Sequence, residues 1–293
     1  MPDSSPYRDL LDAIPQRSRV VEAWGIRTAV FEYGPETGRP LVLVHGFRGD
    51  HHGLEPIAAH LPGLRVIAPD LPGFGDSDAL PEATIEAFAA WLRALVANEA
   101  PGAAVLGHSF GSIVVAHAAA SGLDASRIVL INAIAMPALS GSNRLGSLLA
   151  LGYYRAAAAL PERAGLALLG AKPIVRGMSA FMAKTRNRGL RRWIHGQHDR
   201  YFSNYASRGS VLQAFDASIR HTVGEVAGRI ALPVQLIAAD RDDITPLGHQ
   251  RGLQASFPDA RLAVLHGVGH LVHYEQPREA ARVIRRFLAE AGE

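Results

Sequence analysis

The chain contains no cysteine among its 293 residues. Disulfide bonds, thiolate metal sites and a cysteine nucleophile are therefore excluded. The sequence also has no apolar run of the roughly 18–20 residues that a helix needs to cross a bilayer. Its polar start, Met1-Pro2-Asp3-Ser4-Ser5-Pro6, lacks the basic and then apolar pattern of a signal peptide. We therefore expect a cytoplasmic protein without a membrane span.

Charge is scarce and unevenly distributed. Only 19% of the residues are charged and 48% are hydrophobic, a composition typical of a globular protein. Residues 133–232 carry 14 Lys or Arg against 4 Asp or Glu, whereas the rest of the chain carries 16 against 23. The basic run at 184–193 indicates a solvated helix face in preference to a nucleic-acid surface. Attraction of an anionic substrate toward a cleft stays open as a third interpretation.

Short apolar stretches with the length of strands alternate with helical segments. This alternation predicts an α/β fold whose sheet is mostly parallel and covered by helices on both faces. We expect strands at 19–23, 28–33, 41–45, 64–68, 103–106, 127–131, 234–239 and 261–265, the first two antiparallel. We expect helices at 53–61, 84–99, 112–121, 247–257 and 277–290.

The alternation stops after Asn132, and the sequence up to about Arg229 is helical in character without a strong strand run. We therefore expect a core made of residues 1–132 and 230–293, with residues 133–229 inserted as a helical cap. Such an insertion covers the carboxyl edge of the sheet, where open α/β sheets bind ligands.

The pentapeptide Gly107-His108-Ser109-Phe110-Gly111 joins an apolar strand to a helix. A serine at such a turn has strained backbone angles, and the residues two positions away must be small so that the turn can close. The hydroxyl is exposed at the start of a helix, where free backbone N–H groups stabilise negative charge. This pattern predicts Ser109 as a nucleophile.

A serine hydroxyl is a poor nucleophile until a base takes its proton, and histidine is the expected base. His270 ends the segment Gly267-Val268-Gly269-His270, which follows the last strand and so lies at the same sheet edge as Ser109. His266 falls at the strand end without flanking small residues, and His273 is expected to begin the terminal helix. We predict His270 as the base.

The acid that orients this base should follow a strand and precede the histidine. Three aspartates follow the strand at 234–239, namely Asp240, Asp242 and Asp243. Asp242 lies far enough past the strand to face His270, whereas Asp240 is expected to cap the strand and Asp243 the next turn. The strand after the nucleophile helix offers another position for the acid, but the uncharged Asn132 occupies it. We predict Asp242.

Two aligned N–H donors are needed where negative charge develops on the substrate oxygen. The backbone N–H of Phe110, directly after the nucleophile, is one candidate. The N–H of Phe47 is the other, because it lies in the glycine-containing loop His45-Gly46-Phe47-Arg48-Gly49 that follows a strand.

Taken together, these segments resemble an α/β-hydrolase with a helical cap. The matching pieces, in the family's Ser–Asp–His order, are His45-Gly46-Phe47, Asp70-Leu71-Pro72-Gly73-Phe74-Gly75-Asp76-Ser77, residues 107–111, residues 240–246 and residues 267–277. The resemblance covers the chain from about residue 20 onward. In that family the acid stands four residues before a proline such as Pro246, which implies Asp242. The resemblance is specific for fold and catalytic triad, and says little about the substrate.

Departures from other members of that family narrow the expected chemistry. Dehalogenase-like and epoxide-hydrolase-like members use aspartate where this chain has Ser109. The loop at 45–48 lacks the Ser-Gly-rich sequence of C–C hydrolases, and Leu271 replaces the tryptophan that those enzymes usually carry after the histidine. The turn at 107–111 is not the Gly-Gly-Ser type of proline iminopeptidases.

The resemblance therefore implies a serine hydrolase that cleaves a carboxylic ester of a small or medium acyl substrate. We expect no cofactor and no metal, and we interpret His51-His52 as part of a solvated loop, not a metal site. Two alternatives stay open: C–C bond or thioester hydrolysis of an anionic substrate, and a ligand receptor that retains the triad.

Overall fold

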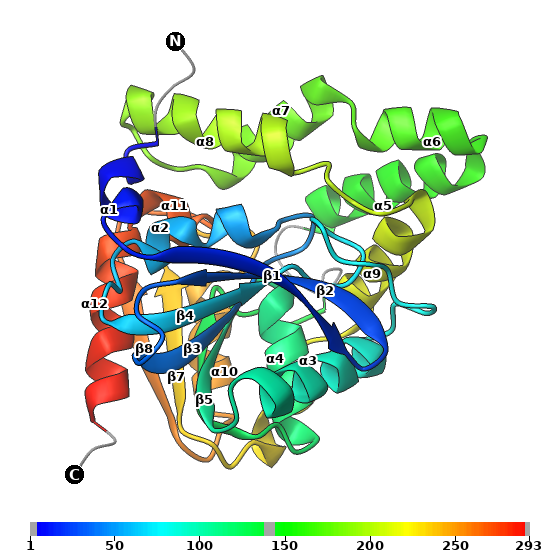
Figure 1. The fold of residues 1–293 in the computed structure, drawn as a ribbon. Helices are drawn as coiled ribbons and strands as arrows, with labels where there is room; N and C mark the ends of the chain where they lie inside the picture. Colours follow the sequence, from blue (N-terminus) through cyan, green and yellow to red (C-terminus); the bar gives the residue numbers. More distant parts are fainter. Residues whose placement is uncertain (1–4, 138–143, 291–293) are drawn as a thin grey trace.

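The computed structural model describes residues 5–137 and 144–290, and within them the strands form one eight-stranded sheet. The strands are β1 (Gln16–Ala23), β2 (Ile26–Tyr33), β3 (Arg39–Val44), β4 (Leu64–Pro69), β5 (Ala103–His108), β6 (Ala125–Ile131), β7 (Val234–Ala239) and β8 (Ala260–Leu265). They are ordered β1-β2-β4-β3-β5-β6-β7-β8 (Figure 1). β1 and β2 are antiparallel to each other, β2 is antiparallel to β4, and all other pairs are parallel. The predicted α/β fold and all eight predicted strands are confirmed.

Helices cover both faces of this sheet, as the continuous apolar strands predict. In β3, Leu41 and Leu43 face one core while Val42 and Val44 face the other, because successive side chains of a strand point to opposite faces. The first core holds residues of α2 (Glu55–Ala58) and α12 (Pro277–Ala289). The second holds residues of α3 (Ile85–Glu99), α4 (Phe110–Ala120) and α10 (Leu247–Gln254).

The smaller elements lie at the ends of the sheet and in its loops. They are α1 (Arg8–Asp12), the 3-10 turns at His51–Gly53 and Ala227–Arg229, and α11 (Val272–Glu275). His273 was predicted to begin the terminal helix, and this prediction is wrong. It lies in α11, and α12 begins only at Pro277, since proline has no N–H to donate and suits the first turn of a helix.

Between β6 and β7 the described part of the chain is helical. The helices are α5 (Arg144–Ala159), α6 (Glu162–Leu169), α7 (Lys172–Met182), α8 (Arg188–Tyr201) and α9 (Arg208–Arg220). Helices α5–α8 form a layer across the top of the view, above the sheet (Figure 1). Residues 138–143, which fall inside the predicted cap, and the polar residues 1–4 lie outside the described residues.

The segment between α8 and α9 pairs with the loop that follows β4. Phe74 and Tyr205 form an isolated β-bridge, and the Gly75 amide donates to the Asn204 carbonyl at 3.1 Å. This backbone pairing ties the helical layer to the core.

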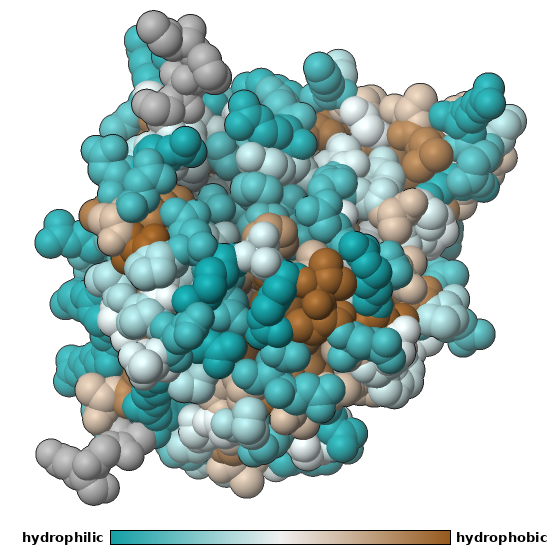
Figure 2. Space-filling model, in the orientation of Figure 1, coloured by the Kyte–Doolittle hydropathy of each residue, from teal (hydrophilic) through white to brown (hydrophobic). Residues whose placement is uncertain are grey.

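The surface in Figure 2 is mainly hydrophilic, with a hydrophobic patch near the middle of the view, where Figure 1 draws β1 and β2, and smaller ones over α5 and α6. Leu149 and Leu160 in this region are exposed. Among the described residues, no helix combines the length and the apolar character that crossing a membrane requires.

Candidate active site

Ser109 lies on a sharp turn between β5 and α4. Its backbone has φ 54° and ψ −117°, a conformation that is strained for any residue with a side chain. The turn also requires glycine on both sides of it. A Cβ atom at Gly107 would lie 2.3 Å from the Gly111 carbonyl oxygen, and one at Gly111 would lie 2.3 Å from the Val44 oxygen. The close approach of these backbones explains why the pentapeptide carries both glycines.

The structure brings together the three side chains predicted as nucleophile, base and acid. His270 Nε2 lies 2.8 Å from Ser109 Oγ, and His270 Nδ1 lies 2.8 Å from Asp242 Oδ2. Because an ionised carboxylate only accepts, Nδ1 carries the proton and Nε2 is left to accept from the serine hydroxyl. Ser109 and His270 are 161 residues apart in the sequence. They meet because both follow parallel strands, whose carboxyl ends lie at the same edge of the sheet.

Asp242 is held as a charged acceptor. Its Oδ1 accepts the amides of Ile244 and Thr245, and its Oδ2 accepts the Thr245 hydroxyl as well as His270. Burial by itself raises the pKa of this carboxyl, but His270 and the hydrogen bonds lower the pKa to about 2. The carboxylate therefore stays negative and fixes the orientation of the imidazole.

The other acidic and basic candidates of these loops have different partners. Asp240 was expected to cap the strand, but its carboxylate accepts the Gly267 amide and pairs with the exposed His266 at 3.0 Å. Asp243 was expected to cap a turn, but it pairs with Lys184 at 2.6 Å. These two aspartates instead fix the loop after β8 and a segment between α7 and α8.

The two predicted oxyanion donors belong to segments that adjoin Ser109. Phe110 is the first residue of α4, so its N–H has no acceptor within the helix. The loop that contains Phe47 lies close to Ser109, since a Cβ atom on Gly46 would lie 3.3 Å from the Ser109 Cβ. Within the described ranges, neither amide donates to a protein acceptor. Both N–H groups are therefore free for a ligand.

Two residues that hold the histidine loop were missed by the sequence reasoning. Asn132 was considered only as an acid, yet its side chain donates to the His270 carbonyl at 2.8 Å and accepts the Ala239 amide at 3.1 Å. Glu275 accepts the amides of Gly269 and Lys184, each at 2.7 Å. A polar side chain at the end of a buried strand was the available signal for Asn132, whereas no local pattern indicates Glu275.

A cavity of about 730 Å³ opens above Ser109 and His270. Volumes of this order hold ligands the size of small organic molecules. Its walls are largely apolar, and the helices between β6 and β7 contribute Leu149, Tyr154, Met178, Phe181 and Phe215 to them. Among the described residues that line it, Arg48 is the one Lys or Arg. The basic run at 184–193 contributes no lining residue in that set.

Burial keeps two other histidines of the cavity wall, His108 and His198, neutral. Burial and the neighbouring His270 lower the pKa of His108 to about 3, and burial with nearby His195 and Arg176 lowers that of His198 to about 3. His108 Nε2 donates to the His270 carbonyl at 3.1 Å. Of His108, His198 and His270, only His270 has a carboxylate at one ring nitrogen and a serine hydroxyl at the other in the part of the chain that the structure describes.

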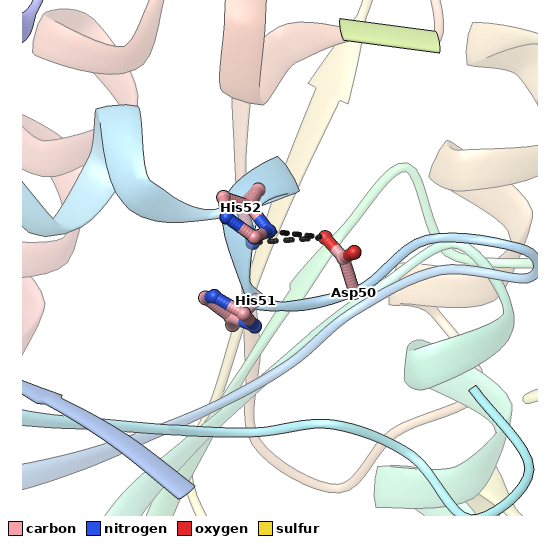
Figure 3. Close-up of side chains that lie close together, drawn as sticks. All are labelled: Asp50, His51 and His52. Carbon is pink, nitrogen blue, oxygen red and sulfur yellow. Dashed lines mark hydrogen bonds and ion pairs between the residues drawn. The ribbon is translucent and has the colours of Figure 1, made fainter. Parts of the chain in front are cut away.

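Asp50, His51 and His52 each offer a metal-ligand atom, and these atoms lie within 4.8 Å of one another (Figure 3). The expectation of a solvated loop is wrong here, because Asp50 and His51 are buried. The centres of the two rings lie 3.9 Å apart at a tilt of 35°. His52 Nδ1 donates to Asp50, and His51 Nδ1 donates to Asp70. Protein carboxylates thus already engage the Nδ1 atom of each ring, and we assign no metal to this group.

A second such group joins the end of α4 to the segment after α9. His117, His221 and Glu225 bring three ligand atoms within 4.8 Å. His221 Nδ1 contacts Glu225 at 3.1 Å, and His117 Nε2 donates to the Thr222 carbonyl at 3.2 Å. Protein partners thus already engage these nitrogens, and we assign no catalytic role to this group.

Comparisons with known proteins agree with this architecture. The chain is 31% identical to the dihydrolipoyllysine-residue acetyltransferase component of the acetoin cleaving system of Pseudomonas putida, over 88% of this chain and 65% of that protein. It therefore spans less than two thirds of that relative's length. It is 26% identical to a pimeloyl-(acyl-carrier protein) methyl ester esterase of Neisseria meningitidis, over 87% of this chain and 95% of that protein.

A solved structure has the same fold. A thermophilic esterase from Thermogutta terrifontis superposes with a TM-score of 0.75 at 22% identity, covering 94% of this chain and 100% of that chain. The sequence also matches the family described as Alpha/beta hydrolase family over residues 41–283. On this match, which spans most of the core strands and the helical layer, the chain belongs to the alpha/beta hydrolase family.

Proposed function

We propose that this protein is a serine hydrolase that cleaves a carboxylic ester of a small or medium acyl substrate. The observation that carries the proposal is the hydrogen-bonded line from Asp242 through His270 to Ser109, with 2.8 Å at each step. Two relatives add support: the methyl ester esterase of Neisseria meningitidis is similar in sequence, and the esterase of Thermogutta terrifontis is similar in fold.

In the proposed reaction, Ser109 Oγ attacks the ester carbonyl while His270 Nε2 accepts its proton. The amides of Phe47 and Phe110 stabilise the negative charge on the tetrahedral oxygen. His270 then donates the proton to the leaving alcohol, and an acyl group remains on Ser109. A water molecule activated by the same imidazole releases the carboxylic acid and restores the serine.

The cavity favours a neutral, apolar acyl group over an anionic substrate. All five donors of Arg48, the cation of its lining, are directed at protein oxygens, so this charge is not available to pair with a carboxylate. The apolar walls stabilise hydrocarbon by removing it from water. We further propose that residues 133–229 act as a cap that sets the acyl preference.

Replacement of the nucleophile tests the proposal. Ser109→Ala is expected to lower kcat on p-nitrophenyl butyrate by at least about a thousandfold, because triad members act as a unit. The matched control is Ser256→Ala, an exposed serine just past the end of α10, which is expected to keep wild-type turnover. Mass detection of an acyl or phosphonyl adduct on residue 109 identifies the nucleophile. Undiminished turnover in Ser109→Ala would overturn the proposal.

A further inference from the structure

Arg48 is a buried cation without a buried anion as partner. It follows Phe47 directly in the loop after β3, and its side chain is 0% exposed. Its backbone has φ 60°, in the left-handed region that is unfavourable for a residue with a side chain. All of its hydrogen-bond partners within the described residues are neutral oxygens. Such a residue is retained only where its surroundings compensate both the charge and the strain.

Every acceptor of the Arg48 guanidinium belongs to the segment between β6 and β7. Nε donates to the Phe202 carbonyl at 3.1 Å, and Nη2 donates to the Leu169 carbonyl at 2.7 Å. The remaining acceptors are the hydroxyls of Tyr153, Tyr154 and Ser203, at 3.5, 3.3 and 3.2 Å. The guanidinium also lies 4.7 Å from the centre of the Phe202 ring. One side chain of the core thus holds three parts of the helical layer.

The two carbonyl acceptors explain how the charge is compensated. Leu169 is the last residue of α6, and Phe202 is the C-cap of α8. Carbonyls at a helix C-terminus carry the negative end of the helix dipole and stabilise a nearby cation. Arg48 is therefore compensated by the ends of two cap helices, and this compensation exists only while those helices stay in place.

The backbone of the same loop faces the nucleophile. Phe47, which bears one of the two free amides, immediately precedes Arg48, and Gly46 lies against Ser109 as described above. Arg48 has a strained backbone and is joined to Phe47 by one planar peptide, so relaxation of the Arg48 backbone is passed directly to the backbone of Phe47. The oxyanion donor and the cap contact thus belong to adjacent residues.

We propose that Arg48 is a positioning residue that couples the cap to the oxyanion loop. With α6 and α8 in place, the guanidinium is fully bonded and the Phe47 N–H faces the substrate oxygen. When these helix ends move away, the guanidinium loses its acceptors, the strained loop relaxes and the donor leaves its place. This inference rests on the proposed ester hydrolysis and adds that transition-state stabilisation depends on the cap through Arg48.

Arg48→Met tests the coupling, with turnover expressed per folded enzyme from active-site titration and circular dichroism. Loss of one oxyanion donor lowers kcat by about 10²- to 10³-fold, so we expect a fall of at least about 30-fold with KM changed less than about threefold. Inhibition by a trifluoromethyl ketone, whose adduct carries an oxyanion, should weaken by a similar factor. A residue that only stabilises the fold would move neither quantity per folded molecule.

Arg208→Met is the matched control. Arg208 also donates to carbonyls at a cap helix end, to Leu160 at 2.6 Å and Ala157 at 3.2 Å, but within the described residues no hydrogen bond or ion pair joins it to the 45–49 loop. We expect this variant to lose stability and to keep kcat within about threefold. Equal effects of Arg48→Met and Arg208→Met on kcat would overturn the coupling, because a general loosening of the cap would then explain both.

Arg48→Lys covers the case in which the methionine variant does not fold. It keeps the buried charge, but a single ammonium cannot reach both helix ends, so an intermediate loss of about three- to tenfold in kcat is expected. Wild-type kcat in Arg48→Lys and unchanged ketone inhibition would reject the inference. If Ser109→Ala is inactive while the Arg48 variants behave as wild type, the coupling fails and the proposed function stands. If Ser109→Ala is active, the proposed function fails.

Discussion

Two buried histidine–aspartate pairs lie at the carboxyl edge of the sheet and differ in what surrounds them. His270 contacts Asp242 at 2.8 Å in the loops after β8 and β7, and His51 contacts Asp70 at 2.9 Å in the loops after β3 and β4. Their side chains are equally buried, at 5% and 0% exposure in the first pair and 6% and 0% in the second. Neither distance nor burial distinguishes the two pairs.

The difference lies in the neighbours of each ring. His270 directs its second nitrogen to Ser109, whereas the His51 ring is stacked on Phe31 with centroids 3.3 Å apart. Asp70 also accepts the amides of His51 and Asp76, so it ties two loops together. The two buried histidine–aspartate pairs thus differ in that only the His270 ring has a serine hydroxyl hydrogen-bonded at its second nitrogen among the described residues.

Replacement of each carboxylate by an amide is the strongest test of whether the two pairs have different roles. Asp242→Asn should lower kcat by about 10³- to 10⁴-fold, because the amide no longer fixes the proton on His270 Nδ1. Asp70→Asn should keep kcat within about fivefold per folded enzyme and lower the free energy of unfolding by about 2–4 kcal/mol. Ester turnover and urea denaturation measure the two effects. A comparable loss of kcat in both variants would show that the pairs are not different in kind.

One glycine in the loop after β4 and one in the loop after β8 allow the steric constraints of the two loops to be compared. Gly75 has φ 55°, and a Cβ there would lie 2.1 Å from the Asp70 carboxylate, whereas Gly267 has φ 79° with open space around it. Gly267→Ala should cost about 1–2 kcal/mol from backbone strain alone. Gly75→Ala should cost more, about 3 kcal/mol or above, since it also displaces Asp70. Thermal and urea unfolding compare them, and equal costs would mean that the Asp70 loop is not tightly constrained.

The pH dependence of stability reports on two buried histidines that have no carboxylate partner in the described part of the chain, and it is the smallest of the three effects. Burial lowers the pKa values of His108 and His198 to about 3, while in the unfolded chain they return to about 6.5. Below pH 6.5 the unfolded state therefore binds more protons, and the free energy of unfolding should fall as the pH drops toward 3. The slope is up to about 1.4 kcal/mol per pH unit for each histidine.

His198→Gln removes one of these groups and should give a shallower slope between pH 6.5 and 4.5 in urea titrations. Asp242 does not contribute to this slope, because its pKa is lowered from 3.8 to about 2. Its stabilising contribution is complete above pH 3.8 and is lost as the pH falls through 2. An identical slope in wild type and His198→Gln would contradict the assignment of the acid sensitivity to this ring.

Much of the fold follows from local patterns. Apolar runs such as 41–45 predicted strands because both faces of a central parallel strand are buried, and the structure confirms all eight. The glycines at 107 and 111 predicted the serine turn because the steric demand acts within five residues. The helix ends and the short α11 were less predictable, since they depend on neighbouring segments.

Residues whose roles depend on distant partners were not predictable in this way. Asn132 and Glu275 hold the His270 loop through contacts with segments far away in sequence. His51 was interpreted as solvated, because the sequence does not indicate that Phe31 and Asp70 enclose it. Arg48 is an ordinary loop residue by sequence and a fully buried cation in the structure.

The sequence by itself determined the order of strands and helices, the turn that presents Ser109, and the small set of residues from which its base and acid could come. The tertiary structure decided which of these side chains meet, which histidines stay neutral, and where the charge of Arg48 is compensated. The physical reason is range: periodicity and turn sterics act over a few neighbouring residues. Burial, charge compensation and a hydrogen bond across 161 residues exist only after the strands have assembled.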